Sequence, residues 1–101
     1  MKVEQFKVKN QFIIRGGNEI TFQSYNSTIA VVDNGSITLG SDWDYSKTTL
    51  KYLYAFLDEE ARYIVNAELK STINSIFESN NKKSKIAKLI ENNIINYNEN
   101  L

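Results

Sequence analysis

The spacing of apolar residues changes near Gly40, and this change constrains the fold more than any other feature of the sequence. Before Gly40, apolar residues alternate with polar ones or form short runs, which is typical of strands. After Gly40 they recur every three or four residues, which is typical of amphipathic helices. We therefore predict one α+β domain over residues 1–101. It should have a three- or four-stranded antiparallel meander over 1–40, then two or three helices over 46–97 on one face of the sheet.

Two segments within the strand region carry turn signals. Arg15-Gly16-Gly17-Asn18 and Asp33-Asn34-Gly35-Ser36 both combine Gly with Asn, the residues that most readily adopt the positive φ of tight turns. Apolar strand-like residues flank both segments, so each predicts a hairpin.

The helical region divides at two further places. Ser46 or Asp44 is suited to cap the first helix. Asp58-Glu59-Glu60 predicts the start of a second helix, because acidic residues are favoured in a first turn. A polar segment, 79–84, precedes a shorter third stripe. The Asn-rich tail 96–101 is expected to fray.

The apolar stripes of these helices suggest a contact with a second copy of the chain. The apolar faces of two long helices are together larger than one small sheet is expected to cover. We therefore expect one of them to pack against another molecule, which would make the protein a homodimer.

The composition argues against an enzyme. The chain has no His and no Cys, which removes Ser-His and Cys-His mechanisms, disulfides and zinc-finger ligands. Lys and Arg number 12, as do Asp and Glu, so no overall charge attracts nucleic acid. No acidic pair stands at a spacing suited to catalysis. We expect no catalytic residue, no metal and no cofactor.

The segment Asp42-Trp43-Asp44-Tyr45 is the first candidate for binding a partner. Trp and Tyr are enriched at the centres of protein interfaces, and here two carboxylates accompany them. The alternative is structural, with Trp43 closing the end of the core and Asp44 capping the helix. Two aspartates alone lack the further oxygen ligands that a calcium loop needs.

The second candidate is a basic patch. Lys82, Lys83 and Lys85, with Lys88, give the C-terminal segment a local positive charge. They could neutralise a few phosphates in a salt-sensitive way, although no Arg is present there to read a base. The alternative is a solvated loop and helix start. The chain also has six tyrosines, whose rings could stack on nucleic-acid bases, but few basic residues accompany them in the strands.

Residues 22–57 contain two short motifs. They read S-Y-N-S-T-I-A over residues 24–30 and W-D-Y-S-K-T-T-L-K over residues 43–51. In these motifs the chain resembles a family of small, mostly uncharacterised proteins of Firmicute phages and mobile elements. The resemblance implies that the second motif, with Thr48 and Thr49, joins a hairpin to the first helix. It assigns no activity.

Small phage proteins without catalytic residues often act by occupying a host protein, as anti-CRISPR inhibitors do. We therefore expect a phage or mobile-element binding protein that inhibits a host defence complex, such as a CRISPR effector, by stoichiometric contact. The alternative is a small accessory nucleic-acid-binding protein. No apolar run is long enough for a signal peptide or a membrane span, so we expect the host cytoplasm and no membrane partner.

Overall fold

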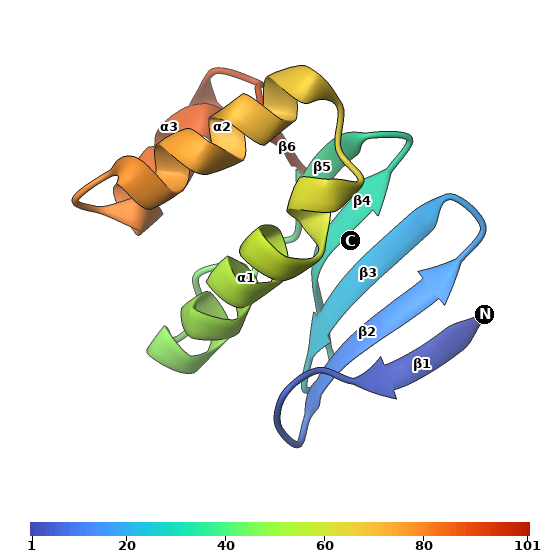
Figure 1. Ribbon diagram of the computed structural model, residues 1–101. Coiled ribbons are helices and arrows are strands. Elements are labelled where there is room, and N and C mark those ends of the chain that lie inside the picture. Colours follow the sequence, from blue (N-terminus) through green and yellow to red (C-terminus); the bar gives the residue numbers. More distant parts are fainter.

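The computed structural model describes residues 1–101 and consists of one mixed sheet with three helices on one of its faces (Figure 1). The α+β prediction is confirmed. The strands are β1 (Lys2–Gln5), β2 (Gln11–Gly16), β3 (Glu19–Ser24), β4 (Ser27–Asp33), β5 (Ser36–Leu39) and β6 (Asn96–Tyr97). The helices are α1 (Lys47–Glu59), the short 3-10 helix η1 (Ala61–Tyr63), α2 (Ala67–Glu78) and α3 (Lys82–Glu91).

The strands lie in the sheet in the order in which the chain makes them, from β1 to β6. The first five form an antiparallel meander, one strand more than the upper limit of the prediction. The extra strand arises because the N-terminal segment splits into β1 and β2. Lys7 and Asn10 have positive φ values of 68° and 71° in the loop that joins them. Lys7 gives no turn signal in the sequence, and Asn10, although Asn tolerates positive φ, has no neighbouring Gly to mark a turn.

Both predicted hairpins are present. Gly17 has φ of 57° between β2 and β3, and Asn34 and Gly35 have φ of 51° and 82° between β4 and β5. These positive values explain why Gly and Asn occupy the turns.

The core lies between the sheet and α1. Phe22 of β3 stacks on Phe56 of α1 with ring centroids 5.6 Å apart, and Phe6 meets Phe22 edge to face at 6.0 Å. Leu53 and Leu57 of α1 are fully buried beside Phe56.

The spacing of apolar residues predicts a buried face of Leu50, Leu53, Tyr54 and Leu57, with Phe56 on its flank. The structure confirms Leu53 and Leu57, but Phe56 lies at the centre of the buried face, and Leu50 and Tyr54 are only partly buried.

One expectation about helix ends is corrected, and one of two alternatives is confirmed. Asp58-Glu59-Glu60 does not begin a helix but ends α1, and α2 starts later, where the Asn66 side chain accepts the Leu69 N–H at 2.9 Å. At the other end of α1 the cap is Ser46, which accepts the Thr49 N–H at 3.1 Å. Asp44 has no capping role.

The acidic residues stand at an end of α1 where the helix dipole disfavours negative charge, and each has a cation nearby. Arg62 binds Asp58 at 2.7 Å, Lys7 binds Glu59 at 2.8 Å and Arg15 binds Glu60 at 2.9 Å. These cations come from the loop before β2, from β2 and from η1. Arg62 is only four residues from Asp58, whereas Lys7 and Arg15 come from distant parts of the chain, so two of the three pairs could not be read from the local sequence.

The apolar stripes of α2 and α3 are covered within the chain. Their buried residues belong to the same core cluster as the sheet residues: Leu69, Ile73, Ile76, Ile86 and Leu89. The apolar sides of α2 and α3 therefore pack against the core of the same molecule. Each helix falls short of the length and apolar content that a membrane crossing requires.

The C-terminal tail is ordered, contrary to the expectation of fraying. Asn96 and Tyr97 form β6, which pairs parallel to Thr38 and Leu39 of β5. Beyond β6, the Leu101 side chain lies close to Gly40.

Gly40 provides a test of this packing. A Cβ atom at position 40 would lie 2.6 Å from the Thr28 carbonyl oxygen, closer than real contacts allow, and 3.3 Å from the Leu101 Cβ, which is a tight contact. We predict that Gly40→Ala lowers the free energy of unfolding by about 2 kcal/mol, because backbone must move. Urea denaturation measures the change. Gly16→Ala is the control, since its Cβ would meet only the Met1 Cα at 3.9 Å. Equal stability of the two variants would contradict the packing described.

Candidate functional site

A hollow of about 480 Å³ opens at the end of the sheet where the β3–β4 turn faces the loop between β5 and α1. We call it the tyrosine hollow, because Tyr25 and Tyr45 are its two exposed aromatic residues. Its remaining lining comes from the β3–β4 hairpin, the β5–α1 loop and the first turn of α1: Ser24, Asn26, Ser27, Ile29, Asp42 and Thr49. The hollow therefore combines an apolar floor at Ile29 with polar walls.

Tyr25 is held in an unusual conformation. Tyr25 and Asn26 form a two-residue loop between the paired residues Ser24 and Ser27, and Tyr25 has φ of 54°. Large side chains rarely adopt this left-handed region, and such strain tends to occur at functional sites. The Tyr25 N–H donates to the Asn10 carbonyl at 2.7 Å, which fixes the strained backbone. The side chain itself is 57% exposed.

The β5–α1 loop positions the other side of the hollow. Its backbone turns twice, with the Trp43 N–H donating to the Gly40 carbonyl and the Tyr45 N–H to that of Asp42, both at 3.1 Å. The Trp43 side chain lies in the core and is only 6% exposed, which anchors the loop. Tyr45 is 79% exposed. The Ser27 hydroxyl donates to Asp42 Oδ2 at 2.9 Å and links the loop to β4.

One polar atom of the lining has no partner. Ser24 is 3% exposed, and its hydroxyl makes no hydrogen bond. Its cross-strand neighbour Gln11 likewise has a buried side-chain oxygen, Oε1, without a partner. Buried polar groups are nearly always hydrogen-bonded, and these two unpaired atoms lie on neighbouring strands behind the surface of the hollow.

The charge of the hollow is negative. Asp42 is the one ionisable acid among the eight lining residues, and none of them is basic. Its Oδ2 is held by Ser27. Carboxylate and tyrosine rings together favour a positively charged group in this space.

The candidate residues from the sequence occupy different environments. Asp42 and Tyr45 line the hollow. Trp43 is buried, as the structural interpretation of this residue requires, and it offers little surface to a partner. Asp44 is partly buried but does not line the hollow.

The three candidate lysines are elsewhere. Lys82, Lys83 and Lys85 belong to the first turns of α3 and do not line the hollow. Lys82 Nζ lies 5.9 Å from the ring centroids of both Tyr54 and Phe77, so it packs between α1 and α2. Burial raises the pKa of Tyr54. The sequence-based patch is thus not part of the same site as Asp42 and Tyr45.

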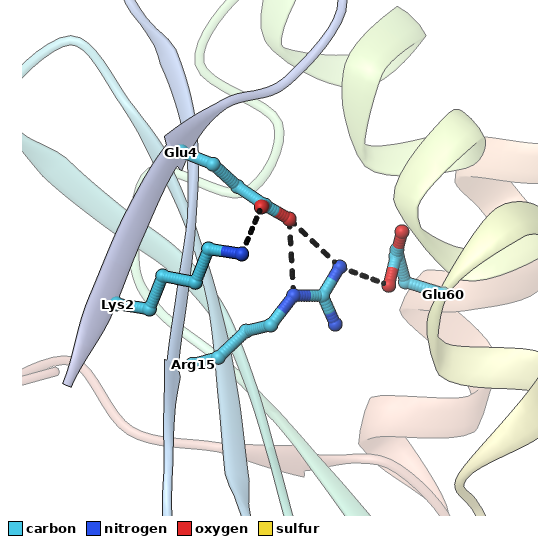
Figure 2. A network of polar contacts seen from close by, with 4 residues as sticks. All are labelled: Lys2, Glu4, Arg15 and Glu60. Carbon is cyan, nitrogen blue, oxygen red and sulfur yellow. Dashed lines mark hydrogen bonds and ion pairs between the residues drawn. The ribbon is translucent and has the colours of Figure 1, made fainter.

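A second polar cluster joins the edge of the sheet to the end of α1 (Figure 2). Arg15 Nη2 lies 2.9 Å from both Glu4 Oε1 and Glu60 Oε1, and Lys2 Nζ lies 3.7 Å from Glu4 Oε2. Hydrogen bonding to Glu60 raises the pKa of Arg15, burial opposes the rise, and Glu4 adds to it. These groups neutralise one another, and the cluster therefore acts as a tie between β1, β2 and α1.

Sequence reasoning missed most of the hollow. Ser24, Ser27, Ile29 and Thr49 were not predicted as site residues, and Tyr25 was considered only for base stacking. The available signal was the pair of motifs, because the hollow takes residues from both the S-Y-N-S-T-I-A segment and the W-D-Y-S-K-T-T-L-K segment. The fold brings these two segments together.

Comparison with known proteins gives one match. Neither the curated proteins nor the solved structures contain a match to this chain. A family of unknown function, DUF8033, matches residues 1–85. The match includes the whole antiparallel meander, α1, α2 and every residue of the tyrosine hollow. It covers most of the sequence, and the chain therefore belongs to the DUF8033 family.

Proposed function

We propose that this protein is a phage- or mobile-element-encoded binding protein that inhibits a host defence complex, such as a CRISPR effector, by stoichiometric protein–protein contact. The observation that supports this most directly is the tyrosine hollow, where two exposed tyrosines flank a concave surface. The proposal places the contact at Tyr25, Asp42 and Tyr45.

The two tyrosines have the properties of interface anchors. Tyr25 and Tyr45 are 57% and 79% exposed, so both rings are available to a partner. Tyrosine buries a large area with few rotatable bonds, and its hydroxyl forms hydrogen bonds at the rim of an interface. The tight turn at Tyr25 and the core anchor at Trp43 hold both backbones in place, which reduces the entropy lost on binding.

The partner group that suits the hollow is a Lys or Arg side chain. Asp42 supplies a carboxylate, the tyrosine faces attract cations, and no basic lining residue competes. A guanidinium or ammonium group from a host protein would satisfy both kinds of contact.

Two segments of the sequence point to the source of the partner. The S-Y-N-S-T-I-A and W-D-Y-S-K-T-T-L-K segments resemble those of phage and mobile-element proteins, and both contribute to the hollow. A host complex is therefore the proposed target. The nucleic-acid alternative receives less support at this site, because phosphate would meet Asp42 and no Lys or Arg.

Two substitutions test the proposal. We predict that Tyr45→Ala and Asp42→Asn each weaken capture of the host partner at least about tenfold, because they remove an anchor and the charge for a cation. Quantitative pull-down from a Firmicute lysate, followed by plaquing of a targeted phage on a CRISPR-immune host that expresses each variant, measures both steps. Wild type should restore plaquing and the two variants should not.

The matched control is Tyr63→Ala. Tyr63 is 73% exposed on η1 and does not line the hollow, so its loss should leave capture and plaquing unchanged. Equal losses in all three variants would argue against the hollow as the contact. Salt-sensitive binding of labelled DNA without capture of a protein would favour the nucleic-acid alternative.

Tyr25 allows stability and binding to be separated. We predict that Tyr25→Gly raises the free energy of unfolding by about 1 kcal/mol, because Gly adopts a φ of 54° without strain, while capture of the partner falls. Denaturant titration and pull-down measure the two effects. Asn34→Gly, at φ of 51°, should gain less because Asn tolerates this conformation. A destabilised Tyr25→Gly protein would contradict the interpretation of strain.

A further inference from the structure

Strand β1 forms an open edge of the sheet, whereas the opposite edge is partly covered by the short strand β6. We propose that two copies of this chain pair through β1, edge to edge and antiparallel, about a two-fold axis at Val3. This proposal is independent of the tyrosine hollow, which contains no β1 residue.

The backbone of β1 decides which residues can pair. The Phe6 N–H donates to the Gln11 carbonyl at 2.7 Å, and β1 pairs with β2 in the same register. Backbone groups alternate in direction along an antiparallel strand, so Lys2 and Glu4 direct theirs toward β2. Val3 and Gln5 therefore direct their N–H and C=O groups toward the free edge. A second strand must place its own outward-facing residues opposite these.

The charges of Lys2 and Glu4 favour one register for the pairing of two β1 strands. If Glu4 lies on the two-fold axis, two glutamates face each other, and if Lys2 lies there, two lysines do. If Val3 lies on the axis, Lys2 of each copy faces Glu4 of the other. Opposite charges across antiparallel strands stabilise the pair and like charges destabilise it. The sequence of β1 is thus complementary to itself in the Val3 register.

The side chains already have the orientation that this register needs. Lys2 and Glu4 project from the same side of β1, with Lys2 Nζ 3.7 Å from Glu4 Oε2 (Figure 2). Glu4 Oε1 is held by Arg15, and Oε2 faces the exposed Lys2 of the same copy, so in the pair Lys2 of the second copy would replace that lysine at Oε2. In the pair, Lys2 of the second copy would extend the network that runs from Glu4 through Arg15 to Glu60.

The other face of β1 is also suited to this contact. Val3 is 58% exposed and lies beside Ile14 in a cross-strand row that continues through Thr21 to Val31. This row is on the face of the sheet that the helices leave open (Figure 1). Pairing at Val3 would bring two such rows together and shield both valines. Because both copies use the same edge, the assembly would close at two molecules.

Charge reversal tests the register directly. We expect wild-type protein to show a concentration-dependent dimer by sedimentation velocity, weaker at high salt. Lys2→Glu and Glu4→Lys should each weaken self-association about tenfold, because each places like charges opposite one another twice. An equimolar mixture of the two variants should form a heterodimer. There, the new carboxylate at position 2 faces the new ammonium at position 4, and native Lys2 faces native Glu4.

Further variants keep the test independent of folding. Val3→Pro removes an N–H that points away from β2, so it should abolish the dimer while circular dichroism shows a folded monomer. Lys70→Glu on α2 and Glu91→Lys on α3 are charge-matched controls that should still dimerise, since both lie away from β1 (Figure 1). A wild-type protein that stays monomeric at every concentration, or a mixture that fails to associate, would overturn the proposal.

Discussion

The packing of α1 on β3, centred on the stacked rings of Phe22 and Phe56, is the contact on which the rest of the structure depends. It fixes the direction of α1 across the sheet. The N-terminal end of α1 then supplies Thr49 to the tyrosine hollow, and Ser46 closes its first turn. The C-terminal end places Glu60 beside Arg15, which in turn holds Glu4 of β1. One helix orientation therefore sets the geometry of the hollow and of the sheet edge.

The sequence was informative where local preference and tertiary packing agree. Asn34-Gly35 marked a hairpin because its φ values require such residues, and the stripe of α1 faces the core as its period indicated. It failed where distant residues decide the outcome. The acidic triplet lies at the end of α1, where Lys7 and Arg15 from the N-terminal part of the chain pair with Glu59 and Glu60, and β6 forms because β5 offers an edge. No local pattern contains these distant partners.

The same reasoning applies to the hollow. Asp42 and Tyr45 were found because an aromatic residue beside a carboxylate is conspicuous in sequence. Tyr25 lines the hollow because it stands in a strained turn, and Ser24 lines it from a buried position beside β2. A linear sequence pattern reveals neither feature. Trp43 stands out in the sequence in the same way, but its large side chain lies in the core and not on the surface.

If both proposals hold, each dimer presents two tyrosine hollows and can engage two sites on an oligomeric target, with a gain in avidity that needs no new contact.

The order of the strands also bears on how the protein folds during synthesis. Because β1 to β5 are neighbours both in the chain and in the sheet, the meander needs no segment from the C-terminal half. Its strands can therefore pair in the order in which the ribosome releases them, and packing of α1 then buries the apolar face of the sheet. The two-residue strand β6 is synthesised last, so its pairing with β5 completes the sheet only when the rest of the fold is present.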